Sequence, residues 1–267
     1  MKKSIQIIAT SFAILLGNVG FSQVDSVYIV KGDSVMAVYA TTEVDSVIFY
    51  RPNSLSETSL VEYGEGATDI DGNAYQSVII GTQEWMVENL RTSKYSDGTA
   101  IPNVTGNTEW YLLSTGAWSH YDNDSSQYEA TYGKLYNWYA VETGKLCPTG
   151  WHVPTYAEWT VFTDYLAANG HSGTEGTALK ATSGWNDYYG ASGNGTDDYG
   201  WNGLPGGART TVGGFFSIGD YGYWWSSSHY SFYDADAWSH CLFYSNDDVY
   251  RNNDGNINGY SVRCLRD

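Results

Sequence analysis

The sequence predicts an α+β fold, in which short strands and long loops combine with two helices. The composition favours β-structure, because 24 Tyr and 11 Trp occur beside 30 Gly in a chain of 267 residues, and aromatic residues suit strands while glycines suit turns. Two segments, 132–142 and 155–168, instead place apolar residues at helical spacing. We expect the main domain to span 67–267, with a small β unit before it.

The N-terminus is predicted to be a signal peptide over residues 1–22. Lys2 and Lys3 precede a mostly apolar run over 5–16, and small residues then stand just before Gln23. That order is typical of a Sec signal peptide with cleavage before Gln23. The apolar run is shorter than the roughly 20 residues that cross a bilayer. We therefore expect export to the medium or the outer cell surface, without a membrane span.

The net charge argues against two classes of partner. Cleavage of the signal peptide would remove two lysines and no acidic residue, so the formal charge would change from −17 to −19. Such a surface repels nucleic acid and anionic lipid. It attracts calcium or basic partners, although keeping an exported protein soluble is the simpler interpretation.

Residues 23–51 are predicted to form a small three-stranded unit. A Val-Asp-Ser-Val motif at 24–27 recurs at 44–47, and Asp-Ser-Val occurs at 33–35. Each copy begins a run of alternating, β-branched or aromatic residues, as strands do. Residues 52–66 are rich in Ser, Glu and Gly without periodicity, which predicts a linker.

The strands of the main domain are predicted from alternation and turn residues. Gly81-Thr82 forms a turn between two of them. The predicted strands are 75–80, 83–87, 223–227, 237–244 and 260–265.

The two predicted helices differ in the strength of their signals. In 132–142, Leu135, Trp138 and Tyr139 recur at helical spacing and Gly144 follows as a stop. In 155–168, Thr155 and Glu158 form a capping box. An apolar face then follows, and Asn169-Gly170 ends the helix.

Three cysteines are present, Cys147, Cys241 and Cys264. In an exported chain an odd count predicts one disulfide and one free thiol. The spacing alone does not choose the pair. No two cysteines lie close enough in sequence for a zinc motif.

Seven stretches of the main domain resemble one family, the Fibrobacter succinogenes major paralogous domain. In chain order they are DGNAY (71–75), IIGTQEWMVENL (79–90), YGKLYNW (132–138), CPTGWHVP (147–154), DDYGWNGLPGG (197–207), WSSS (225–228) and GYSVRC (259–264). The resemblance covers about 200 residues and follows the family order.

The resemblance implies a C-type-lectin-like fold, with two helices on a twisted, loop-rich antiparallel sheet. The domain is similar in its ending to formylglycine-generating enzymes and to variable ligand-binding proteins that share this fold. It also implies a disulfide between Cys147 and Cys264, tying the first helix to the last strand and leaving Cys241 free. The family has no established activity, and a fold does not supply one.

In lectin-like relatives the long loops before the final strands meet the ligand, which here implies 226–236 and 245–258. Aromatic rings in such loops stack on sugars, and carboxylates and amides bind the hydroxyls. The alternative is that these rings form the cores of the loops. The candidate ligand-binding residues are Trp201, Tyr230, Phe232, Tyr233, Asp234, Asp236, Asn246, Asp248, Arg251 and Asn253.

Acidic and amide residues in the late loops are also candidate calcium ligands. Asp247, Asp248 and Asp254 offer carboxylate oxygens, and they suit calcium if the loops bring them together. The same residues are ordinary in turns. No other cofactor is expected.

We therefore expect an exported, non-catalytic binding or adhesion module. Its ligand would be a glycan or a cell-surface protein, bound through the C-terminal loops. One alternative is an oxidoreductase of the formylglycine-generating type, which needs a late cysteine pair such as Cys241 and Cys264. Another is a structural subunit whose N-terminal strands engage a neighbour. The oligomeric state stays open.

Overall fold

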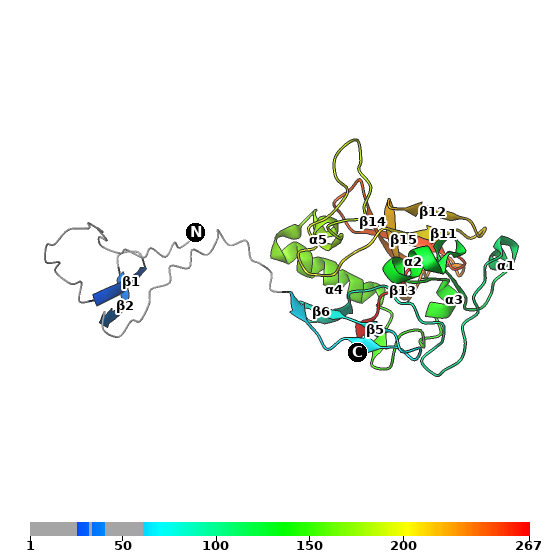
Figure 1. Ribbon diagram of the computed structural model, residues 1–267, viewed down its shortest axis with the longest axis horizontal. Helices are drawn as coiled ribbons and strands as arrows, with labels where there is room; N and C mark the ends of the chain where they lie inside the picture. Colours follow the sequence, from blue (N-terminus) through cyan, green and yellow to red (C-terminus); the bar gives the residue numbers. More distant parts are fainter. Residues whose placement is uncertain (1–25, 32–33, 41–60) are drawn as a thin grey trace. The chain divides into compact units, whose positions relative to one another are not determined.

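The computed structural model describes residues 26–31, 34–40 and 61–267, which fall into two units (Figure 1). In the first unit β1 (Ser26–Lys31) and β2 (Ser34–Ala40) pair antiparallel. These are two of the three strands predicted there. The third, which begins at Val47, and the predicted signal peptide lie outside the described residues.

The second unit has a mixed α+β architecture built on two five-stranded sheets. The first sheet has the antiparallel order β10-β16-β7-β6-β3. Its strand β3 lies within the predicted linker, so the ordered pairing begins before Ala67. The strands are β3 (Glu62–Tyr63), β6 (Ser77–Ile80), β7 (Gln83–Met86), β10 (Trp151–His152) and β16 (Leu265–Arg266).

The second sheet carries the longest strands, in the order β12-β11-β13-β14-β15. All neighbours are antiparallel except β11 and β13, which are parallel. The strands are β11 (Gly206–Arg209), β12 (Phe215–Ile218), β13 (Tyr221–His229), β14 (Asp236–Phe243) and β15 (Tyr250–Gly255). Two small ladders complete the unit, β4 (Ala67–Thr68) with β5 (Ala74–Tyr75), and β8 (Trp118–Ser119) with β9 (Leu135–Tyr136).

The predicted late strands are confirmed at β13 and β14 but not throughout 260–265. There Tyr260 and Ser261 make single bridges to Tyr136 and Trp224. A ladder strand begins only at Leu265.

Helix α4 (Tyr156–Leu166) confirms the second predicted helix. Thr155 Oγ1 accepts from the Glu158 N–H, and the Glu158 carboxylate accepts from the Thr155 N–H, so the capping box is complete. A single π turn, η3 (Ala167–His171), ends it, with Gly170 at φ +103°. The other helical segments are α1 (Asn107–Tyr111), η2 (Tyr121–Asn123), α2 (Ser125–Tyr132), α3 (Trp138–Val141) and α5 (Glu175–Leu179). In Figure 1, α4 and α5 lie on one side of the unit and α1, α2 and α3 on the other.

The predicted helix over 132–142 is wrong except for the short α3. Gly133 adopts φ +72°, and a Cβ there would lie 2.7 Å from the Leu90 carbonyl oxygen. The N–H of Lys134 donates to the Leu90 carbonyl and that of Tyr136 to the Tyr260 carbonyl, instead of to the preceding turn. Contacts with distant segments therefore override the local periodicity, and a helix starts only after the Asn137 cap.

The second sheet lies between two hydrophobic cores. Because side chains alternate along a strand, neighbouring residues of β13 point to opposite faces. Trp224 belongs to the core beneath α4, with Trp159 and Phe162, whereas Trp225 belongs to the core that includes Trp138. The sheet is thus held from both faces.

Cys147 and Cys264 are joined by a disulfide with a Cα–Cα distance of 6.0 Å, which is the pair that the resemblance implies. Cys241 is a buried free thiol. The bridge spans 117 residues of sequence. In the chain-entropy model a loop of that size contributes roughly 4–5 kcal/mol.

A polar network around Asn89 lies inside the unit. Asn89 Oδ1 accepts from Arg263 Nε at 3.0 Å and from Trp224 Nε1 at 2.9 Å, while its Nδ2 donates to the Tyr132 carbonyl and to Ser261 Oγ. One amide side chain therefore joins four segments that are far apart in the sequence. All four partners lie in or next to the motifs that carry the family resemblance.

His152 lies near the start of α4 between two carboxylates, and its protonation makes the free energy of unfolding depend on pH. Its Nδ1 lies 2.7 Å from Asp267 Oδ1 and its Nε2 lies 2.9 Å from Glu158 Oε1. Burial alone would lower the pKa of His152, but these two hydrogen bonds raise it above its ordinary value. Burial alone would raise the pKa of Glu158, but hydrogen bonds from Thr155 and His152 lower it.

We predict that His152→Gln flattens the alkaline side of the stability profile. A raised pKa in the folded state adds stability below about pH 6.5, the unfolded value. That contribution is lost as the pH rises through the folded value. The midpoint of urea unfolding, measured from pH 5 to about pH 9, should fall with pH in the parent and less steeply in the variant. Parallel curves would contradict a role for this histidine. Because the side chains are partly exposed, the effect should shrink at high salt.

Candidate functional site

The two loops implied to meet the ligand lie at opposite ends of β14. The first joins β13 to β14 around 230–235, and the second joins β14 to β15 around 244–249. In the register of β14 with β15, Asp236 faces Gly255 and Cys241 faces Tyr250. Five strand residues separate these pairs, which is about 17 Å. Part of the expected loop 245–258 is the strand β15, so the candidate residues do not form one cluster.

Aromatic side chains instead form a strip that includes the first residue of α4, which we call the aromatic strip: Tyr156, Tyr230, Phe232, Tyr233 and Trp238. The ring centroids of Tyr230 and Trp238 are 5.0 Å apart, and those of Trp238 and Tyr156 are 4.6 Å apart. Tyr230 also contacts Phe232 and Tyr233. Phe232 is 78% exposed and Tyr233 is 65% exposed. The strip therefore runs from two exposed rings at the loop to the first turn of α4.

Polar groups border the aromatic strip along β15. Asn253 faces Trp238 across the ladder, and its Nδ2 donates to Asp236 Oδ2 at 3.3 Å. Asp234 is exposed, and its carbonyl lies 2.9 Å from His229 Nε2. Of the three candidates Asp234, Asp236 and Asn253, the structure brings Asp236 and Asn253 together beside Trp238, whereas Asp234 lies in the loop between β13 and β14.

Arg251 lies next to the aromatic strip and contacts its member Tyr156. Its Nη1 donates to the Tyr156 hydroxyl at 3.1 Å and its Nη2 donates to Thr163 Oγ1 at 3.2 Å. The guanidinium also lies 5.4 Å from the centre of the Tyr156 ring. These contacts fix an exposed cation at the edge of the aromatic surface.

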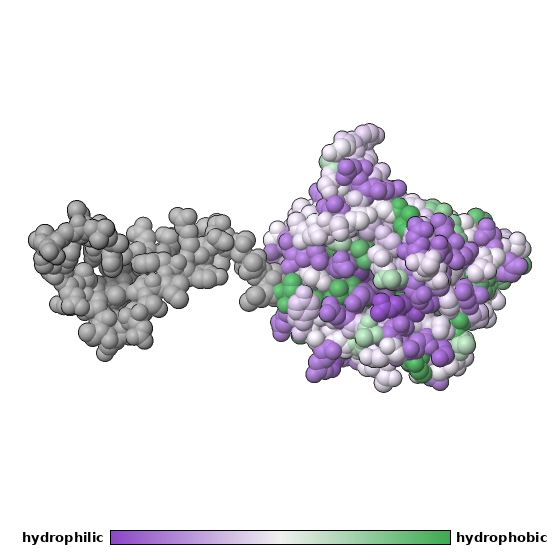
Figure 2. All heavy atoms as spheres, in the orientation of Figure 1, coloured by the Kyte–Doolittle hydropathy of each residue, from purple (hydrophilic) through white to green (hydrophobic). Residues whose placement is uncertain are grey.

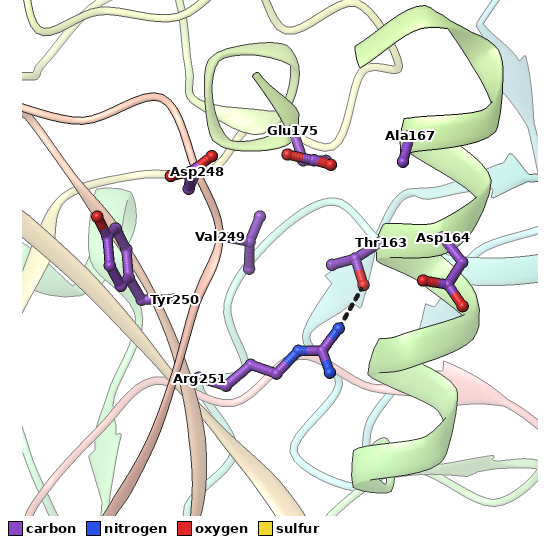
Figure 3. Close-up of a pocket in the computed structure, with 8 residues that line it drawn as sticks. All are labelled: Thr163, Asp164, Ala167, Glu175, Asp248, Val249, Tyr250 and Arg251. Carbon is purple, nitrogen blue, oxygen red and sulfur yellow. Dashed lines mark hydrogen bonds between the residues drawn. The ribbon is translucent and has the colours of Figure 1, made fainter. Parts of the chain in front are cut away.

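A hollow of about 340 Å³ opens next to Arg251, between α4, the start of α5 and the turn before β15 (Figure 3). Asp164, Glu175 and Asp248 bring three carboxylates to it. Asp248 is the only other candidate residue that lines it. The remaining lining residues are Thr163, Ala167, Val249, Tyr250 and Arg251.

His240 lies beneath this surface and stays neutral. Its ring stacks on Trp159 with centroids 4.3 Å apart. Burial, and then the charge of Arg251, lower the pKa of His240 to about 3. The floor of the strip therefore carries no charge near neutral pH.

Trp201 is fully buried. The expectation that it contacts a ligand is therefore wrong. The Arg263 guanidinium lies 4.0 Å from its ring centre, and the rings of Trp85, Trp159 and Trp224 surround it. Its place in a Gly- and Asp-rich stretch suggested a surface loop. Arg263, whose guanidinium covers the Trp201 ring, lies 62 positions later in the sequence.

The sequence suggested that the side-chain amide of Asn246 binds a ligand, but both of its ends are hydrogen-bonded within its own turn. Its Nδ2 donates to the Tyr250 hydroxyl at 2.6 Å, and its Oδ1 accepts from the Asp248 N–H at 2.8 Å. Its carbonyl accepts from Lys180 Nζ. These bonds fix the turn between β14 and β15.

The three carboxylates proposed for calcium do not meet. Asp248 lies in the turn before β15, whereas Asp254 lies four positions along that strand from its first residue, Tyr250, which is about 14 Å. Asp254 accepts from Ser239 Oγ, and burial raises its pKa. Asp247 accepts from Thr177 Oγ1 at 2.7 Å, at the start of α5. Over 61–267, no three His, Cys, Asp or Glu residues form a group able to hold a metal ion.

The sequence missed Tyr156 and Trp238, the two rings at the centre of the strip. Neither was named as a candidate, because Tyr156 stands at the start of a predicted helix and Trp238 within a predicted strand, whereas the candidates were sought in loops. For Trp238 the sequence held a weak signal of exposure, because only alternate side chains of β14 can face the same core. Both residues are only partly buried.

The late cysteine pair that an oxidoreductase of the formylglycine-generating type would need is not formed. Cys264 is bound to Cys147. Cys241 is buried, and burial raises the pKa of its thiol, so the reactive thiolate is scarce.

Opposite results are expected when Trp201 and Phe232 are each replaced by alanine. Trp201→Ala should destabilise the protein by about 3–5 kcal/mol, because it empties a core site beside a buried cation. Phe232→Ala should change stability by less than about 0.5 kcal/mol, because the ring is exposed. Denaturant unfolding of both variants checks this. A Phe232→Ala variant as unstable as Trp201→Ala would show that the strip is a structural core.

The surface of the second unit is mostly hydrophilic on the face shown in Figure 2, with apolar residues in small separate groups. Within the described residues, no helix is long and apolar enough to cross a membrane.

Comparison with known proteins identifies one family. No curated protein and no solved structure matches the chain. The family model described as the Fibrobacter succinogenes major domain matches residues 78–266. That match covers well over half of the chain and includes every strand of the two five-stranded sheets except β3 and the first residue of β6. The chain therefore belongs to the Fibrobacter succinogenes major domain family.

Proposed function

We propose that this protein is an exported, non-catalytic binding module that recognises a carbohydrate at the aromatic strip. The observation that carries the proposal is the exposure of Phe232 and Tyr233, which continue into the packed rings of Tyr230, Trp238 and Tyr156. Exposed apolar groups of this kind mark binding surfaces more often than isolated apolar residues do.

The chemistry of the strip suits a sugar. The C–H face of a sugar ring stacks on an aromatic ring, and its hydroxyls need hydrogen-bond partners at the edge. Asp236 and Asn253 stand at that edge, beside Trp238. The strip thus combines stacking faces with amide and carboxylate groups.

Export and a C-type-lectin-like fold belong to the same proposal. The positively charged, then apolar N-terminus supports passage through Sec to the medium or the outer surface. The bridge from Cys147 to Cys264, together with the loops before the last strand, supports the lectin-like fold. Another cell-surface molecule remains the alternative ligand.

A glycan array with the mature protein tests the proposal. We expect specific binding that Phe232→Ala and Trp238→Ala each weaken at least about tenfold, the loss typical of a central aromatic contact. The matched control is Tyr189→Ala, which removes an aromatic ring that is 93% exposed on a different loop. It should bind like the parent.

Two outcomes would contradict the proposal. One is an array without any bound glycan. The other is binding that the Tyr189→Ala control loses as readily as the strip variants do.

A further inference from the structure

Arg251 differs from the other exposed basic residues of the second unit. Lys94 pairs with Asp71 and Lys145 with Asp97, each at 2.9 Å. Arg266 pairs with Glu84 at 2.8 Å. Across 61–267, Arg251 has no carboxylate within ion-pair distance and donates only to two hydroxyls. An unpaired exposed arginine is unexpected in a chain with 30 acidic and 13 basic residues.

The guanidinium is also oriented in advance. The bonds to Tyr156 and Thr163 use one N–H on each terminal nitrogen, and the Tyr156 ring supports its face. The remaining N–H groups, including that of Nε, have no partner among the described residues. Such a planar fork suits the two oxygens of a carboxylate.

The charge beyond Arg251 is negative. Asp164, Glu175 and Asp248 line the hollow that Arg251 shares (Figure 3). In the figure Glu175 and Asp248 lie across the hollow from the guanidinium, and Asp164 lies on α4 beside Thr163. A second anionic group on the ligand would meet these carboxylates and be repelled.

The position of Arg251 relates it to the rings. Arg251 faces His240 and Asn253 faces Trp238, so the backbone of Arg251 lies two strand positions from the residue opposite Trp238. Two strand positions span about 7 Å, which is comparable with one sugar ring.

We propose that Arg251 binds a single carboxylate on the glycan, carried by a uronic acid next to the sugar that stacks on Trp238. This inference rests on the proposed function and specifies its ligand class. The glycan is a neutral chain with one acidic sugar. A polyanion is disfavoured because the hollow beyond Arg251 is lined by three carboxylates.

Titration calorimetry with three probes distinguishes a glycan with one acidic sugar from a neutral glycan and from a polyanion. The first is an aldouronic oligosaccharide with one uronic acid on a neutral chain. The second is the same compound after reduction of its carboxyl group, and the third is a homopolymeric polyuronate. We expect the parent to prefer the first over the second at least about tenfold, which corresponds to about 1.4 kcal/mol. It should bind the polyuronate less well than the first.

Variants assign that preference to Arg251. Arg251→Gln keeps hydrogen-bond donors near Tyr156 but removes the charge, and it should bind the first two probes equally. Phe232→Ala should weaken both and keep the preference. Thr163→Val removes the bond between α4 and Arg251 without removing the charge, so it should keep most of the preference. Thermal melting of each variant excludes loss of folding as the cause.

The outcomes distinguish the inference from the proposed function. If the neutral probe binds as well as the acidic one, or Arg251→Gln keeps the preference, the inference is wrong and sugar binding stands. Tighter binding of the polyuronate also overturns it. If none of the probes binds and the glycan array is empty, the inference fails together with the proposed function.

Discussion

The structure of the second unit depends on a buried cation. Arg263 is almost fully buried, and burial lowers its pKa to about 9. It makes no direct bond to a carboxylate among the described residues, and instead donates to Asn89 and to the carbonyls of Trp201 and Asn202. Burying such a charge is costly unless hydrogen bonds satisfy it. The rings of Trp201 and Trp224 cover the rest of the guanidinium. The C-terminal segment, β13 and the segment at 201–202 can therefore pack only together.

This arrangement separates the residues that hold the fold from those that are free to bind. Asn89, Trp224 and Arg263 lie in or next to stretches that carry the family resemblance, and all of them are buried. The aromatic strip and Arg251 lie mainly on segments between those stretches. A fixed frame with side chains presented from its loops and strand edges is a common way to place a binding surface. The family signature therefore describes the frame and says little about the ligand.

The sequence predicted those elements whose causes are local. Helix α4 was predicted because Thr155 and Glu158 complete a capping box within one turn, and β13 and β14 because alternation is also local. The helix over 132–142 failed because the N–H of Lys134 bonds to Leu90, which is 44 residues away. The prediction that Trp201 contacts a ligand was wrong for the same reason, because only the fold brings Arg263 over its ring. The three carboxylates proposed for calcium do not come together because residues 250–255, expected to belong to a loop, form the extended strand β15, which carries Asp254 away from Asp248.

The most direct test of this account is a double-mutant cycle on Asn89 and Arg263. Guanidinium unfolding would be measured for the parent, Asn89→Ala, Arg263→Met and the double variant, with the exposed Asn253→Ala as control. Each single variant should lose about 3 kcal/mol or more, because Asn89→Ala leaves buried N–H groups without partners and Arg263→Met leaves buried carbonyls without donors. The double variant should lose at least about 1 kcal/mol less than the sum, because the two residues share one network. Additive losses, or single losses no larger than that of Asn253→Ala, would contradict the claim that this buried network holds the unit together.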